Sequence, residues 1–143
     1  MKKVLLTTEA VHFDVLDDKS EGERYSTQSV GDMQQLGDEL HITYESGNLE
    51  GEDVSVQTLI IGPDYVKTSR PGMGDAFMHF VAGKVTEYVS HTMYGDMYID
   101  VDTKELQIHR KEEILVDMCY QLGAAGEVFT NCRMQIIIKI LSE

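Results

Sequence analysis

Apolar and polar residues alternate along most of the chain with a period of two, the pattern of β-strands that bury one face. The first such segment covers residues 2–14, where Val4 and Leu6 share one face, and a weaker one follows around residues 23–35. The faces expected to point inward in later strands are those of Leu40, Ile42 and Tyr44; Val54, Val56, Thr58 and Ile60; Val66, Thr68 and Arg70; Ala76, Met78 and Phe80; Tyr88, Ser90 and Thr92; and Val128, Thr130, Cys132, Met134, Ile136, Ile138 and Ile140. The pattern therefore predicts strands from one end of the chain to the other.

The clearest single feature is residues 97–108, where the alternation is strict on both sides of Thr103-Lys104. A turn at that dipeptide would place Val101 opposite Leu106, with both side chains on one face. The segment thus predicts an in-register antiparallel hairpin with one buried face and one exposed face.

Residues 114–122 fit two structures. Their apolar positions match the spacing of a helix that ends at the following glycine, and they also alternate like a strand. We expect the strand, because it would pair Leu122 with Val128. The same register would place Tyr120 opposite Thr130.

Eight to ten short strands joined by turns, with no helix long enough for a crossover, are typical of meandering antiparallel pairing. A sheet of that many strands must twist, split or close, and closure removes exposed strand edges. We therefore predict an all-β fold in which residues 1–143 form one domain, a single antiparallel meandering β-barrel.

The charge balance narrows the range of partners. The chain has 25 acidic residues against 12 lysines and arginines, a formal net charge of −13. The overall field of such a surface repels nucleic acid and anionic membranes through their phosphates, so we expect neither as a partner. The hydrophobic content of 42% is ordinary for a globular domain and argues against disorder.

Targeting and redox signals point to the cytoplasm. The apolar run that begins at Val4 meets Glu9 too early for an export signal, which needs about 7–15 apolar residues. No apolar run approaches the roughly 20 residues of a membrane-spanning helix. Cys119 and Cys132 are too few for a disulfide framework, so we expect a cytoplasmic protein with two free thiols.

Several positions predicted to face the barrel interior are polar. Buried hydroxyl and guanidinium groups need hydrogen-bond partners, which are one another, trapped water or a ligand. Arg70 is the most specific of them, because a guanidinium in a barrel mouth can hold a carboxylate or phosphate through two hydrogen bonds. The candidate ligand-binding residues are Tyr44, Thr58, Arg70, Tyr88, Thr92 and Tyr120.

No catalytic, metal or cofactor motif is recognisable. The histidines lack partners at the spacing of zinc sites, although His79 and His91 would approach each other across a hairpin turning near Gly83. A cysteine nucleophile would need an activating base, and neither a serine elbow nor a phosphate-cradling glycine loop is present. We expect no cofactor and no metal, and an enzyme is the least favoured class.

The last predicted strand is apolar on both faces around Ile136, Ile137 and Ile138. A strand that faces water on one side does not have this composition. Its outer face would be covered by a terminal segment, by the region 23–35 or by a second subunit, so a homodimer is one hypothesis.

Turn glycines and alternating apolar residues recur in a definite order from about residue 3 to residue 141. They are Tyr44-Glu45, Gly51, Thr58-Leu59-Ile60, Val66, Arg70, Gly72, Met78, Phe80, Gly83, Tyr88, Thr92, Gly95, Met97, Ile99, Val101, Thr103, Tyr120 and Asn131. In this order the chain resembles the YwiB-like family of bacterial proteins of unknown function, although Ser46 stands where a second acid is expected. The resemblance implies a calycin-type, lipocalin-like barrel and a role in ligand binding, but no reaction.

Two functions remain open at this point. The first is a non-catalytic barrel that binds a small amphipathic or anionic ligand in its interior. The second is a structural or interaction protein with a side-chain-filled barrel, acting through its acidic surface or its last strand. The ligand itself cannot be identified from the sequence.

Overall fold

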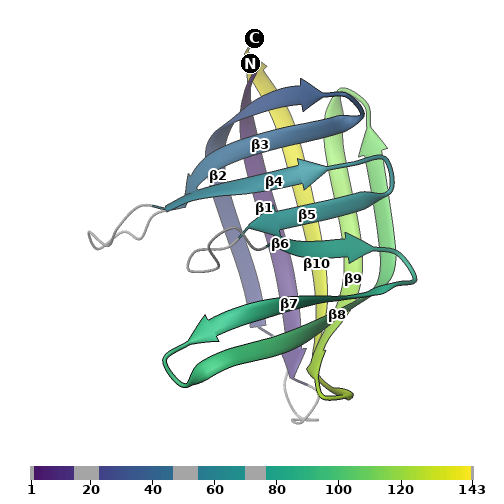
Figure 1. The fold of residues 1–143 in the computed structure, drawn as a ribbon. Helices are drawn as coiled ribbons and strands as arrows, with labels where there is room; N and C mark the ends of the chain where they lie inside the picture. Colours follow the sequence, from purple (N-terminus) through teal and green to yellow (C-terminus); the bar gives the residue numbers. More distant parts are fainter. Residues whose placement is uncertain (1, 15–22, 47–54, 70–76, 143) are drawn as a thin grey trace.

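The architecture is an antiparallel β-barrel that is almost closed (Figure 1). The computed structural model describes residues 2–14, 23–46, 55–69 and 77–142, and within these ranges every regular element is a strand. The prediction of an all-β meander is confirmed.

The ten strands follow one another along the chain. They are β1 (Lys2–Asp14), β2 (Glu23–Leu36), β3 (Glu39–Ser46), β4 (Ser55–Ile61), β5 (Tyr65–Ser69), β6 (Phe77–Val81), β7 (Val85–Thr92), β8 (Gly95–Arg110), β9 (Glu113–Ala124) and β10 (Glu127–Ser142).

The two halves of the sheet meet where the first and last strands pair. The order is β6-β5-β4-β3-β2-β1-β10-β9-β8-β7, so β1 lies between β2 and β10 and the two ends of the chain lie together (Figure 1). The edges of the sheet are β6 and β7, which are consecutive in sequence but share no strand pairing in the described residues. The barrel is therefore closed by pairing on one side and left with a seam on the other.

The turn between β6 and β7 closes part of this seam. The Lys84 amide donates to the Val81 carbonyl at 3.1 Å, which makes the turn predicted around Gly83. The Gly83 amide then donates to the Thr103 carbonyl at 2.9 Å, and the Thr103 amide donates to the Lys84 carbonyl at 3.2 Å. These two bonds attach the turn to the middle of β8.

Inward-facing aliphatic and aromatic side chains fill most of the interior. The largest that are almost fully buried are Tyr120, Phe80, Ile42, Leu59, Ile61, Met78, Met118, Ile138, Val4, Val66, Val101 and Val116. The Phe80 ring on β6 lies 4.8 Å from the Tyr120 ring on β9, measured between centroids. Because β6 pairs only with β5, this contact links the edge strand to the opposite side of the seam.

The hairpin predicted within residues 97–108 is wrong, because these residues belong to the single strand β8. The register of β8 against β9 shifts between Thr103 and Glu105, so that β8 carries one extra residue there. Such a β-bulge switches the inward positions from odd to even numbers, as a two-residue turn would also do. Val101 and Leu106 therefore both face the core without lying opposite each other.

The strand predicted for residues 114–122 is confirmed as β9, but the predicted register is wrong. Thr130 lies opposite Leu122, and Cys132 lies opposite Tyr120. Val128 already lies opposite Gly123 instead of Leu122, and the shift between Val128 and Thr130 adds a second residue of offset to every later pair.

The inward face predicted for β4 is also wrong. Leu59 and Ile61 are buried, whereas Val56 is 68% exposed. Apolar residues occupy both faces of this strand, and the pairing of Leu59 with the buried Ile42 on β3 decides which one turns inward. Thr58 consequently lies on the outer face.

The outer face of β10 is not covered by the region 23–35. That region forms β2, which pairs with β1 in the same layer as β10. On the outer face Ile137 lies between Thr7 of β1 and Leu115 of β9, and all three are half-buried.

Candidate functional site

One part of the barrel interior is a half-open hollow with a mixed polar and apolar lining instead of packed core. Its volume is about 280 Å³, and six strands contribute to its wall. We call it the interior pocket, lined by Leu6, Thr8, Thr27, Ser29, Tyr44, Gln57, Leu59, Thr68, Ser69, Met134 and Ile136. Aliphatic side chains and methionine form one part of the lining, and hydroxyl and amide groups form the other.

Hydrogen bonds hold some of the polar side chains of the interior pocket in place. The Tyr44 hydroxyl donates to Gln57 Oε1 at 3.1 Å, from β3 to β4. The Ser69 hydroxyl accepts a 2.7 Å hydrogen bond from the backbone amide of Thr58. None of the described lining residues is charged. This wall therefore suits an uncharged molecule with both polar and apolar groups.

A glycine on β2 leaves room for Tyr44. Gly31 lies opposite Tyr44, and a Cβ added to Gly31 would come within 2.6 Å of the Thr43 carbonyl oxygen and 3.1 Å of the Tyr44 Cβ. Both neighbours belong to the backbone or to the root of a side chain, so neither can move aside easily. Gly31 thus permits the close approach of β2 and β3 beside the pocket.

The predicted site residues are not brought together at one place. Tyr44 lines the interior pocket, whereas Tyr120 is 1% exposed and packs against Phe80 in the core. Thr58 faces outward and does not line the pocket, which corrects its predicted position. Arg70 lies outside the described residues.

Only the backbone is described for two further candidates. Tyr88 lies opposite Ile99, and Thr92 lies opposite Gly95, in the pairing of β7 with β8. The ligand-binding role of these residues stays a prediction.

Sequence reasoning missed most of the polar lining. On β1 the inward series Val4, Leu6 continues to Thr8, and on β2 the lining residues are Thr27 and Ser29. Thr8 could have been found by extending the alternation by one step. The residues on β2 could not, because that strand has polar residues on both faces.

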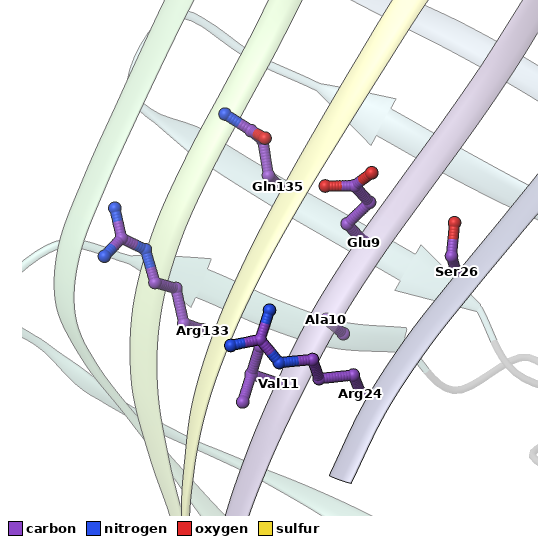
Figure 2. A pocket seen from close by; sticks show the side chains of 7 residues that line it. All are labelled: Glu9, Ala10, Val11, Arg24, Ser26, Arg133 and Gln135. Carbon is purple, nitrogen blue, oxygen red and sulfur yellow. The ribbon is translucent and has the colours of Figure 1, made fainter. Parts of the chain in front are cut away.

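A second hollow lies on the outside of the barrel, over β2, β1 and β10 (Figure 2). Its volume is about 410 Å³. We call it the outer groove, lined by Glu9, Ala10, Val11, Arg24, Ser26, Arg133 and Gln135. Two of the chain's four arginines face this groove.

Comparison with known proteins now places the chain in a family. A family described as a domain of unknown function, DUF1934, matches residues 11–136. The chain belongs to this family. The comparison with curated proteins gave no match.

The DUF1934 barrel is also similar to a solved structure, the crystal structure of the ywiB protein from Bacillus subtilis. The two share 15% sequence identity with a TM-score of 0.78, and the match covers 99% of this chain and 93% of that one. At this identity the likeness concerns the fold. The family resemblance and the barrel expected from the sequence are confirmed.

A polar cluster on the outer face of the DUF1934 barrel joins β3 to β5. The Tyr65 hydroxyl donates to Glu39 Oε2, and His41 Nε2 lies 3.1 Å from Glu39 Oε1. The Tyr65 ring lies over Gly62, where a Cβ would collide with it. The hydrogen bond from Tyr65, and then that with His41, lowers the pKa of Glu39, while the same bond to Glu39 raises the pKa of Tyr65.

This cluster gives a pH-dependent stability. Because the pKa of Glu39 is lower in the folded state, its contribution is present above the ordinary glutamate pKa of about 4.3 and is lost as the pH falls through the folded value. Glu39→Gln is therefore expected to destabilise the protein at pH 7 and to lose its effect in acid. Urea unfolding of both proteins from pH 7 to pH 3 measures this difference.

The control for that measurement is Tyr65→Phe, which removes the hydroxyl donor. In that background Glu39→Gln should have a smaller effect at pH 7, since the largest cause of the shift is gone. An equal loss of stability at pH 7 and pH 3 in the Glu39→Gln protein would contradict the linkage.

The histidines and cysteines form no metal-holding cluster in the described residues. No group of three or more histidine, cysteine or acidic side chains there is placed to hold a metal ion. Cys119 and Cys132 are not joined in a disulfide, and burial raises the pKa of the Cys119 thiol, which disfavours its thiolate. The expected β6–β7 hairpin pairing that would bring His79 toward His91 is not formed in the described residues.

Among the described residues no helix has the length and apolar character to span a membrane.

Proposed function

We propose that this DUF1934 protein is a non-catalytic binding protein that takes a small amphipathic molecule into the interior pocket. The observation that carries the proposal is the half-open hollow of about 280 Å³ in the barrel interior, whose lining combines apolar side chains with a few hydroxyl and amide groups. Small-ligand sites are concave, mostly apolar and equipped with a few convergent polar groups. The interior pocket has that composition.

The wall favours an uncharged polar end on the ligand. Tyr44, Gln57 and Ser69 offer hydroxyl and amide groups, and Leu59 and Ile136 offer apolar contact. An anionic ligand, the alternative raised by the sequence, depends on Arg70.

A pair of neighbouring threonines on β1 tests the proposal. Thr8 lines the interior pocket, whereas Thr7 lies on the outer face. Thr8→Phe is expected to fill the cavity and abolish binding, and Thr7→Phe is expected to leave it intact. Native mass spectrometry of protein purified gently from cells, compared with the same sample denatured, detects the bound mass in each protein.

An extra mass in the original protein and in Thr7→Phe, but not in Thr8→Phe, supports the proposal. Ser29→Leu, a smaller filling change in the same pocket, guards against misfolding of Thr8→Phe, and circular dichroism checks both folds. A bare chain mass for the original protein, or a bound mass that persists in both filled variants, would exclude the interior pocket as the site.

The alternative is an interaction protein, for which a homodimer through the outer face of β10 is the specific form. Val30 on β2 and Leu141 on β10 are 55% and 49% exposed, and Leu5, which lies opposite Val30, is half-buried. An exposed apolar patch of this kind is a feature of protein contact sites. The same native spectra distinguish a monomer from a dimer.

A further inference from the structure

We propose that the outer groove is an anion site that binds the phosphate group of a small molecule between Arg24 and Arg133. This site is separate from the interior pocket, because its polar side chains project from the opposite face of β1. Neither the family nor the structural comparison assigns it a ligand.

The sheet register brings the two arginines to one place. Val11 on β1 lies opposite Arg24 of β2 on one side and opposite Arg133 of β10 on the other. Neighbouring strands are about 4.8 Å apart, so the two arginine Cα atoms are separated by about 10 Å. Figure 2 shows the Arg24 side chain reaching from β2 across β1 beside Val11. In the same view the Arg133 side chain is turned away from Val11, toward Asp117 of β9. A rotation of this exposed side chain back over β10 brings both guanidinium groups to one group held over Val11.

The arginines retain free donors. Arg24 makes no hydrogen bond or ion pair with the described residues. Arg133 has one ion pair, 3.6 Å from its Nη2 to Asp117 Oδ2, and its side chain is 66% exposed. A guanidinium has five N–H donors, so this long contact leaves most of them available. Arg110 differs, because its Nη2 donates to the Ile61 carbonyl at 2.8 Å.

Charge and geometry favour a phosphate over a carboxylate. The two guanidinium groups carry two positive charges, opposed by Glu9 in the next row of the groove and by Asp117 beside Arg133. A phosphate ester carries about −1.5 to −2 at pH 7 and has three terminal oxygens. A carboxylate presents a single edge, which one arginine already satisfies with two hydrogen bonds. The phosphate is therefore the group that uses both arginines.

The neighbouring row of residues in the groove determines which chemical group the phosphate ligand can carry. Glu9 lies there between Ser26 of β2 and Gln135 of β10, about 7 Å along the strand from Val11. Its carboxylate repels a second anion and attracts an ammonium or hydroxyl donor. The outer groove thus suits a phosphate that carries an amino or hydroxyl group on a short linker.

The test is a titration followed by ¹H–¹⁵N NMR in phosphate-free buffer at low salt, with 2-aminoethyl phosphate and inorganic phosphate as probes. Saturable shifts of the amides of Val11, Arg24 and Arg133 are expected with both. Arg24→Gln should weaken binding of either probe about tenfold or more, as expected for loss of a charged hydrogen bond. Lys111→Gln makes the same change in net charge at an exposed position outside the groove and should change binding less than about twofold.

Glu9→Gln is expected to change the binding of the two probes in opposite directions. It should weaken binding of 2-aminoethyl phosphate, because the ammonium group of this ligand loses its carboxylate partner. It should strengthen binding of inorganic phosphate, because the negative charge that repels it is removed. Shifts spread over the basic residues of the whole surface, or equal binding by Arg24→Gln and Lys111→Gln, would overturn the site. Weaker binding of both probes by Glu9→Gln would overturn the role given to Glu9.

Discussion

Phe80→Ala is expected to lower the free energy of unfolding by about 3–5 kcal/mol, the range for removing a buried phenylalanine side chain. Phe80 is 1% exposed, and its ring contacts the Tyr120 ring across the seam. Strand β6 has a pairing partner on one side only, so the loss of this contact also loosens the edge of the barrel. Urea unfolding monitored by circular dichroism measures the change.

Tyr98→Ala is the matched control, because it removes an aromatic ring that is 57% exposed. A surface change of this kind usually alters stability by less than about 0.5 kcal/mol. A decrease in the free energy of unfolding below about 1 kcal/mol for Phe80→Ala would mean that the ring contact does not stabilise the packing between β6 and β9.

Insertion of one alanine between Lys104 and Glu105 is expected to destabilise the barrel by more than about 3 kcal/mol. The insertion would turn Leu106 and Ile108, which pack against the core, toward solvent. It would also turn the Glu105 carboxylate inward, where it has no charged partner in the described core. Chemical unfolding of the variant measures the loss.

Deletion of Lys104 is the matched opposite change. It removes the extra residue of the bulge and leaves Thr103 and Leu106 on the inward face of an uninterrupted strand. Its effect should be clearly smaller than that of the insertion. A larger loss on deletion than on insertion would contradict the bulge at this position.

The alternation of residues predicted the barrel where only one face of a strand is apolar. On β3, Leu40 and Ile42 alternate with the polar His41 and Thr43, and both apolar side chains are buried as expected. In such a strand the local sequence contains all that the side-chain orientation requires.

Alternation failed where a local pattern has two structural explanations. On β8 the change of parity after Thr103 fits both a bulge and a turn, and the choice depends on pairing with β9. On β4 both faces carry apolar residues, and pairing with β3 decides which is buried. Both answers come from contacts between different strands, which a pattern within one strand does not contain.

The candidate sites depend even more on such contacts. The outer groove joins Arg24 to Arg133 through the intervening Val11, although the two arginines are more than 100 residues apart in sequence. The interior pocket combines residues from six strands. Tyr44 alone among its described lining residues was predicted as a binding residue.

The pairing of β1 with β10 has a consequence for how the protein is made. Val4 lies opposite Ile140, so the ribosome must add more than 130 residues after Val4 before this pair can form. At roughly 5–20 residues per second, that delay is on the order of ten seconds. During this time the apolar stripe of β1 lacks its final neighbour. We therefore expect nascent chains to need protection from aggregation, and the barrel to close after translation of its last strand.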